Sequence, residues 1–335
     1  MCKSIGFLVT VFAVFLTSCF PDTTRVVTVN GEISTKKMGR TLHHEHLLVD
    51  FIGADSTGYQ RWNKEDVVER VLPYLVEIKN RGYKTLVECT PAYLGRDPEL
   101  LKMLSEKSGL QIITNTGYYS AYNGKFVPHH AKAETAEEIA ARWINEANNS
   151  IEGTGIYPGF IKISVERGPL TELNRKIVEA ACITHRETGL TIMSHTGLAV
   201  PAFQQLEILK QYGIHPSAFI WTHASNEKDH NKILEAARMG AYVAFDKFTP
   251  DDVHEYVDFI LFMKKHGQLP QVLLSHDAGW YSPGEPDGGK FRGFTDIDNF
   301  LIPALEEVGM AQYDIHQLLY ANPAKAFNIR KRLLD

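Results

Sequence analysis

Cysteine is scarce in this chain of 335 residues, which contains only four. Two of them, Cys2 and Cys19, fall within the first twenty residues, while Cys89 and Cys182 have apolar neighbours. So few cysteines exclude a disulfide-rich scaffold. Export could oxidise the last two, but their distant positions give no reason to pair them, so we expect buried free thiols.

Runs of Lys or Arg are also missing, and the formal net charge is −5. This balance gives no basis for nucleic-acid binding, so we expect none. The remaining composition, 44% hydrophobic and 22% charged residues, is that of an ordinary globular protein.

Long apolar runs are missing except near the amino terminus, where one extends from Ile5 to Leu16. It is short for a membrane span and fits the apolar part of a signal peptide. The Leu-Thr-Ser-Cys that follows resembles a bacterial lipobox. We expect residues 1–19 to be a lipoprotein-type signal peptide and Cys19 the lipidated first mature residue. The protein would then lie on the periplasmic side of a bacterial membrane, the outer one by preference, and contact lipid only through this anchor. The alternative is an uncleaved apolar segment or a weak anchor helix.

Residues 20–335 contain no linker or low-complexity tract, which predicts a single domain. Residues 25–34 predict a small hairpin around an Asn-Gly turn. Eight short apolar runs then alternate with amphipathic helical stretches, several of which end in Gly. The runs are 40–46, 84–90, 110–116, 159–164, 190–195, 218–223, 241–246 and 271–277. Alternating strands and helices imply a parallel α/β sheet, and the count of eight favours a (β/α)₈ TIM barrel over a doubly wound sheet.

Polar residues gather where these runs end, which is the functional face of such a barrel. His44 and His46 are two positions apart on one strand, so their side chains point the same way, away from His43 and Glu45. A buried run contains Lys162, and others end in His195, His223 and Asp277. Each could be a structural residue by itself. Together, these six residues predict a site for zinc or a similar divalent ion.

The sequence resembles the phosphotriesterase-like family of the amidohydrolase superfamily. The resemblance is carried by GRTLHHEHLLVD (39–50), GFIKIS (159–164), WTHAS (221–225), LLSHDAGW (273–280) and ANPAKAFNI (321–329), and covers about residues 25–333. It implies a metal-dependent hydrolase with two divalent ions, zinc by preference and manganese or cobalt as alternatives.

The resemblance also implies a role for each of the six residues. His44, His46 and Asp277 would hold one ion, and His195 and His223 the other. Lys162 would bridge both as an N6-carboxylated lysine, and Asp277 would also act as general base. Because the side chains of His43 and Glu45 point away from the ligand face, we expect structural roles for them.

The sequence departs from phosphotriesterases in one respect. In those enzymes a histidine and a second aspartate relay the proton away from the catalytic aspartate, whereas here Lys247 and Asn226 occupy the matching positions, so this relay is broken. The pair Asp246-Lys247 instead resembles lactonase-like members, so we expect a carboxylic ester or lactone as substrate. Organophosphate triester hydrolysis is the alternative. A second alternative is a non-catalytic metal-binding barrel that serves as a periplasmic binding protein.

Residues in the loops after the strands should choose the substrate. The third loop offers Tyr118, with Tyr119 and Tyr122 nearby, although this cluster could equally be packing. The expected substrate contacts are Tyr118, Lys247, Trp280, Tyr281 and Arg292. Lys247 could instead pair with a neighbouring acid. Monomer and homodimer both remain open.

Overall fold

The structure is a computed structural model that describes Met1 and residues 24–335. The expected signal peptide, apart from Met1, and the lipidation site Cys19 therefore lie outside the described residues. Within the described part, no helix has the length and apolar character to cross a membrane.

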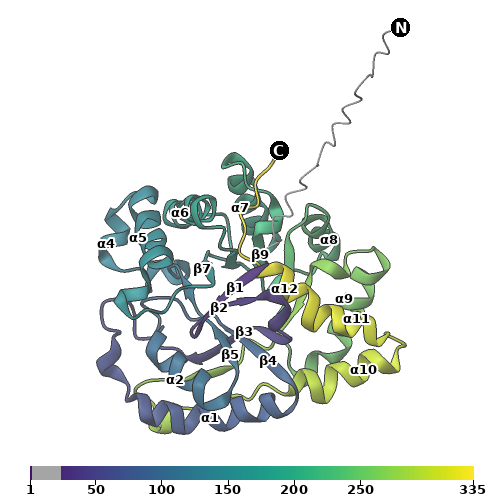
Figure 1. Cartoon of the computed structure of the whole chain (residues 1–335), viewed down its shortest axis with the longest axis horizontal. Coiled ribbons are helices and arrows are strands. Elements are labelled where there is room, and N and C mark those ends of the chain that lie inside the picture. Colours follow the sequence, from purple (N-terminus) through teal and green to yellow (C-terminus); the bar gives the residue numbers. More distant parts are fainter. Residues whose placement is uncertain (2–23) are drawn as a thin grey trace.

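The predicted (β/α)₈ barrel is confirmed, and all eight apolar runs contain strands (Figure 1). Two parallel ladders build the barrel, with strand orders β11-β10-β9-β8-β7-β6 and β12-β3-β4-β5. Their strands are β3 (Arg40–Leu48), β4 (Tyr83–Glu88), β5 (Gln111–Ile113), β6 (Asn115–Thr116), β7 (Phe160–Ser164), β8 (Ile192–His195), β9 (Phe219–Thr222), β10 (Tyr242–Phe245), β11 (Val272–Leu274) and β12 (Gly279–Tyr281). The third run divides into β5 and β6, and β12 lies in a segment expected to be loop.

Helices cover the outside of the barrel (Figure 1). Their ends carry the expected caps: α6 begins after Thr171, whose side chain accepts from the Asn174 N–H, and ends at Gly189 in the left-handed region. The helices are α1 (Lys64–Asn80), α2 (Pro98–Ser108), α3 (Ala121–Gly124), α4 (His129–Ala133), α5 (Ala136–Asn149), α6 (Glu172–Thr188), α7 (Ala199–Gln211), α8 (His230–Arg238), α9 (Val253–Lys265), α10 (Ile302–Glu307), α11 (Gln312–His316) and α12 (Asn322–Ala326).

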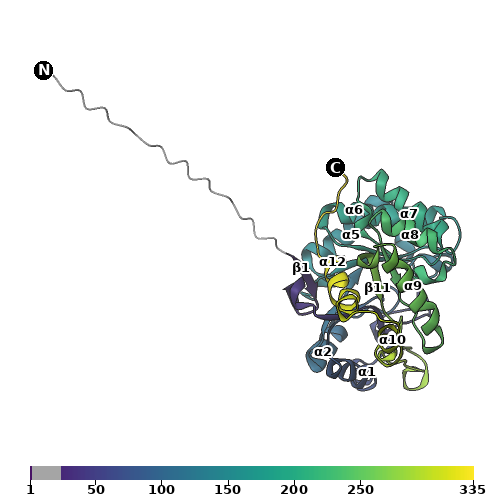
Figure 2. The same ribbon diagram turned by 90° about the vertical axis from the view of Figure 1, so that its right-hand side faces the viewer.

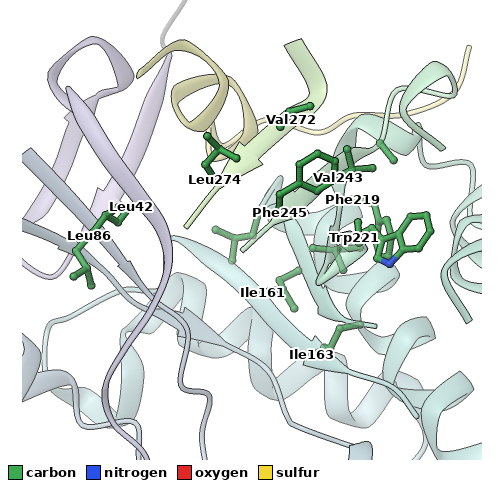
Figure 3. Packing of buried hydrophobic residues seen from close by; sticks show 14 of the residues in the cluster. Leu42, Leu86, Ile161, Ile163, Phe219, Trp221, Val243, Phe245, Val272 and Leu274 are labelled. Carbon is green, nitrogen blue, oxygen red and sulfur yellow. The ribbon is translucent and has the colours of Figure 1, made fainter. Parts of the chain in front are cut away.

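Barrel strands are apolar on both faces. Side chains such as Ile161, Trp221 and Val243 point outward and pack under the helices (Figure 3). The residues that alternate with them along the strands, such as Phe160 and Ile220, fill the barrel interior. This packed interior leaves the strand ends as the place for polar chemistry.

The predicted hairpin is confirmed and closes the amino-terminal end of the barrel. It consists of β1 (Arg25–Thr28) and β2 (Gly31–Ser34), which pair antiparallel. In Figure 2, β1 lies at the left-hand edge of the folded part. Val26 joins the barrel-interior cluster, and the Val29 N–H donates to the Ile112 carbonyl at 2.8 Å. In the described part of the chain, the hairpin therefore covers the amino ends of the strands and leaves their carboxyl ends for a functional site.

Cys89 and Cys182 are buried and free, as expected from the sequence. Cys89 lies in the barrel interior and Cys182 among the outer-layer residues of α6.

Candidate metal centre

The six residues predicted from the strand ends converge on one point at the carboxyl end of the barrel. Nε2 of His46 lies 3.2 Å from Oδ1 of Asp277, and Nε2 of His44 lies 3.6 Å from the same oxygen. Nζ of Lys162 is 3.2 Å from Nε2 of His44. On the other side, Nε2 of His223 is 2.9 Å from Nδ1 of His195 and 3.7 Å from Oδ2 of Asp277.

A buried carboxylate, Asp246, orients two of these histidines from behind. Its Oδ2 accepts a hydrogen bond from Nδ1 of His44 at 2.7 Å, and its Oδ1 accepts from Nδ1 of His223 at 2.8 Å. Burial would raise the pKa of Asp246, but its interactions with His223 and His44 hold the pKa well below the usual value. Both imidazoles therefore direct the lone pair of Nε2 into the site.

His46 is oriented by a hydroxyl group. Its Nδ1 contacts the Thr90 hydroxyl at 2.8 Å, and that hydroxyl donates to the Glu88 carboxylate at 2.6 Å. Because the hydroxyl proton is used on Glu88, Thr90 accepts from His46. The Nε2 lone pair of His46 then faces the Asp277 carboxylate.

The chemistry of this donor set fits a metal cation. A lone pair on His46 and a carboxylate oxygen of Asp277 would repel each other at 3.2 Å unless a cation lay between or beside them. Burial and the nearby charge of Lys162 lower the pKa of His44 to about 3, so His44 is in the neutral form that binds metals. Burial raises the pKa of Asp277, yet the histidines around it lower the pKa further than burial raises it. The set His44, His46 and Asp277 can hold a metal ion, with imidazole and carboxylate ligands.

Lys162 is an unusual residue for this position. Its side chain is almost fully buried on β7, and among the described residues no carboxylate forms an ion pair with it. Its hydrogen-bond partner is Nε2 of His44, itself a predicted ligand. A buried, unpaired ammonium group is costly, so this lysine is suited to a chemical role.

The family model described as the Phosphotriesterase family matches residues 24–327. The chain belongs to this family. It is 28% identical over 295 residues to the phosphotriesterase homology protein of Escherichia coli K12, and the matched region covers 86% of this chain and 98% of that protein. It is 26% identical over 312 residues to an aryldialkylphosphatase of Saccharolobus solfataricus (88% and 97%) and 27% over 343 residues to the N-acetyltaurine hydrolase of Mus musculus (89% and 96%). The protein is therefore a hydrolase of the phosphotriesterase family, which is metal-dependent.

In this phosphotriesterase-family chain, side-chain bonds hold the segment that carries Asp277. The Glu45 carboxylate accepts from the Ser275 hydroxyl, from the N–H and Nδ1 of His276, and from the Ala278 N–H, at 2.7–3.0 Å. Asp277 itself has a φ of 51° and donates its N–H to the His44 carbonyl at 3.1 Å. The structural role expected for Glu45 is thus to fix the backbone around Asp277.

Gly279 makes the same segment possible. Its φ is +100°, and a Cβ at this position would lie 1.8 Å from the His46 carbonyl oxygen. β12 can therefore pair closely beside β3 only because residue 279 is glycine.

A cavity of about 430 Å³ opens over the six residues. One part of its lining is aromatic, with Phe51, Tyr119, Tyr122 and Trp280. The ring centroids of Phe51 and Trp280 are 5.4 Å apart. Exposed cations also line the cavity, namely Lys247 and Arg167, and neither forms an ion pair with another described residue. The cavity therefore offers both apolar and cationic surface to a ligand.

The expected substrate contacts divide into two groups. Lys247 and Trp280 line the cavity, as does Tyr119 beside Tyr118. Tyr118 instead lines a separate hollow with Tyr93 and Arg96, and Tyr281 faces one beside α1. Arg292 also lies outside the cavity lining and is bound to Asp296 at 2.8 Å. The structure does not bring Tyr118, Tyr281 or Arg292 to the metal centre.

Several residues of the centre are not among the ligands and contacts predicted from the sequence, where Asp246 appears only as the neighbour of Lys247. Asp246, Thr90 and Glu88 orient the histidines, and Arg167 and Phe51 line the cavity. Asp246 ends an apolar strand, which is the same signal that marked Asp277, so its place in the centre could have been predicted. Thr90 has no comparable signal, because a threonine after a strand is common.

Proposed function

We propose that the protein uses two divalent ions, zinc by preference, to hydrolyse a carboxylic ester or lactone. The observation that supports this most is the convergence of six ligand-type side chains whose histidine lone pairs point into one cavity. His44, His46 and Asp277 would hold one ion, and His195 and His223 the other. When bound, such ions supply Lewis acidity that polarises a carbonyl group and lowers the pKa of water.

Lys162 would bridge the ions as an N6-carboxylated lysine. The ammonium group would lose one proton, and the resulting amine would add to CO₂ and lose a second, which converts a buried cation into an anion with two ligand oxygens. The absence of an ion pair for Lys162 among the described residues, together with its burial, supports this change.

Asp277 would act as the general base. Its carboxylate lines the cavity and would accept a proton from the attacking water while the water oxygen bonds to the carbonyl carbon. The carbon–oxygen bond to the leaving group then breaks, and the alkoxide takes up a proton. The lowered pKa of Asp277, caused by the surrounding histidines, keeps its carboxylate ionised at neutral pH.

Substrate preference would come from the two kinds of surface in the cavity. Phe51 and Trp280 would hold an apolar part of the substrate, while Lys247 would bind its oxygen-rich or acidic part. Because Lys247 and Asn226 stand where phosphotriesterases have a histidine and an aspartate that relay the proton, we rank phosphotriesters as the second substrate class. The relatives named N-acetyltaurine hydrolase are a reason to include an N-acyl amide among the test compounds.

We also propose that the protein is exported through residues 1–19 and anchored by lipid at Cys19. Its partners would then be small-molecule substrates, with no nucleic acid and no membrane contact beyond the lipid.

The test uses residues 20–335 loaded with zinc or manganese and a panel of lactones, aryl carboxylic esters, an N-acyl amide and an aryl phosphotriester. Each compound is assayed with and without a chelator. Chelator-sensitive turnover of lactones or esters well above that of the phosphotriester is expected. Dominant phosphotriester turnover would reverse the ranking. A protein that binds two ions and turns over none of these classes would favour the binding-protein alternative.

A further inference from the structure

Asp246 is in contact with one histidine from each proposed ion site. His44 belongs to the set with His46 and Asp277, whereas His223 belongs to the set with His195. Yet both donate from Nδ1 to the same fully buried carboxylate, at 2.7 and 2.8 Å. No other described carboxylate contacts Nδ1 of either histidine.

The two oxygens of Asp246 have different surroundings. Oδ1 accepts two hydrogen bonds, from the backbone N–H of His223 at 3.0 Å and from its Nδ1. Oδ2 accepts from Nδ1 of His44 and lies 3.9 Å from Nε2 of His43. Since Nδ1 of His43 donates to the Leu274 carbonyl at 3.0 Å, Nε2 of His43 is an acceptor rather than a donor.

We propose that Asp246 is a positioning residue that sets the tautomer of one ligand in each of the two ion sites. Only a group that accepts on both oxygens keeps His44 and His223 protonated on Nδ1 and free to bind metal through Nε2. This inference deepens the proposed function and rests on it. It also gives Asp246 a role apart from that of Lys247 beside it, because Asp246 does not line the cavity.

The substitution Asp246→Asn separates the two sites. The amide oxygen should replace Oδ1, because that side faces an obligate backbone donor and a second N–H. The amide nitrogen then takes the place of Oδ2, where it donates to Nδ1 of His44. His44 must move its proton to Nε2, where it blocks metal binding, while His223 is unchanged. Nε2 of His43 lies on the same side, so the amide N–H groups face acceptors and the fold should tolerate the change.

The measurements are zinc stoichiometry by equilibrium dialysis and histidine tautomers by two-bond ¹H–¹⁵N correlation in the metal-free protein. Wild type should bind two zinc ions and show both histidines protonated on Nδ1. In Asp246→Asn, one of the two ions should bind at least 10-fold more weakly than in wild type. Of the two histidines, only His44 should change to the tautomer protonated on Nε2. Thr222→Val is the matched control, because this buried hydroxyl next to His223 has no hydrogen-bond partner, and it should behave as wild type.

Unchanged affinities for both zinc ions, or an unchanged His44 tautomer, in Asp246→Asn would overturn the inference. Loss of both ions would also overturn it, because the amide oxygen should still hold His223 in its metal-binding tautomer, and Asp246 would then act as a ligand itself. Wild type without zinc would mean that the proposed function fails instead. If the variant does not fold, wild-type tautomers still decide, because either histidine protonated on Nε2 contradicts the proposal.

Discussion

The hydrogen bonds of Glu45 make a specific prediction about stability. In Glu45→Gln the amide oxygen can take the position that accepts from Ser275 and His276, but the amide nitrogen then faces the Ala278 N–H. One charge-assisted bond is lost and one buried donor is left without an acceptor, while the remaining bonds become neutral. The unsatisfied Ala278 N–H costs about 1–3 kcal/mol and the loss of charge in the remaining bonds adds to it, so we expect a loss of about 3 kcal/mol in the free energy of unfolding.

Urea unfolding followed by circular dichroism measures this loss. With an m value of about 3 kcal/mol/M, the midpoint should fall by about 1 M. Glu32→Gln is the control, because the same change there breaks only an exposed ion pair with Arg25 and should cost less than about 1 kcal/mol. A Glu45→Gln protein that unfolds within about 0.2 M of the control would refute the reasoning.

Other predictions concern the centre and the acid stability of the fold. Lys162→Ala should lose bound metal and most activity, and small carboxylic acids in the buffer should partly restore both; full activity without them would remove the bridging role. Asp277→Asn should lower kcat by about 100-fold or more, and normal turnover by a metal-loaded variant would show that another group takes the proton. Burial lowers the pKa of His185 to about 4, so the unfolded chain binds the proton first as pH falls from 6.5, and stability decreases. With an unfolded pKa of about 6.5, this loss is about 2 kcal/mol at pH 5, and in His185→Gln the difference between urea midpoints at pH 7.5 and pH 5 should shrink accordingly.

The positions of most strands and the grouping of the six candidate ligands could be predicted because they depend on local pattern. Apolar runs that end in polar residues mark strand ends in a barrel, and the i, i+2 spacing of His44 and His46 places both on one face. These features need no knowledge of which strands are neighbours. The family resemblance then supplied the pairing of ligands with ions, which spacing alone does not provide.

The loops could not be predicted in the same way, because alternation is lost where the strands end. Gly117 has a φ of +126°, and a Cβ there would lie 1.9 Å from the Lys162 carbonyl oxygen. This turn resets the direction of the side chains that follow, so Tyr119 rather than Tyr118 lines the cavity. Likewise, nothing in the sequence near Tyr281 indicates that β12 would pair with β3 and direct Trp280 to the cavity instead.

The hairpin at the base of the barrel has a practical consequence for handling this enzyme. The described chain enters at Arg25 in β1, against the amino ends of the strands, and its last residues bond to the loops before β8 and β9 through the Gly189 and Gly213 carbonyls. Both ends of the described segment 24–335 are thus on the side away from the cavity. A solid support, a fluorescent protein or a second enzyme could be joined at either end and leave the route for substrate open.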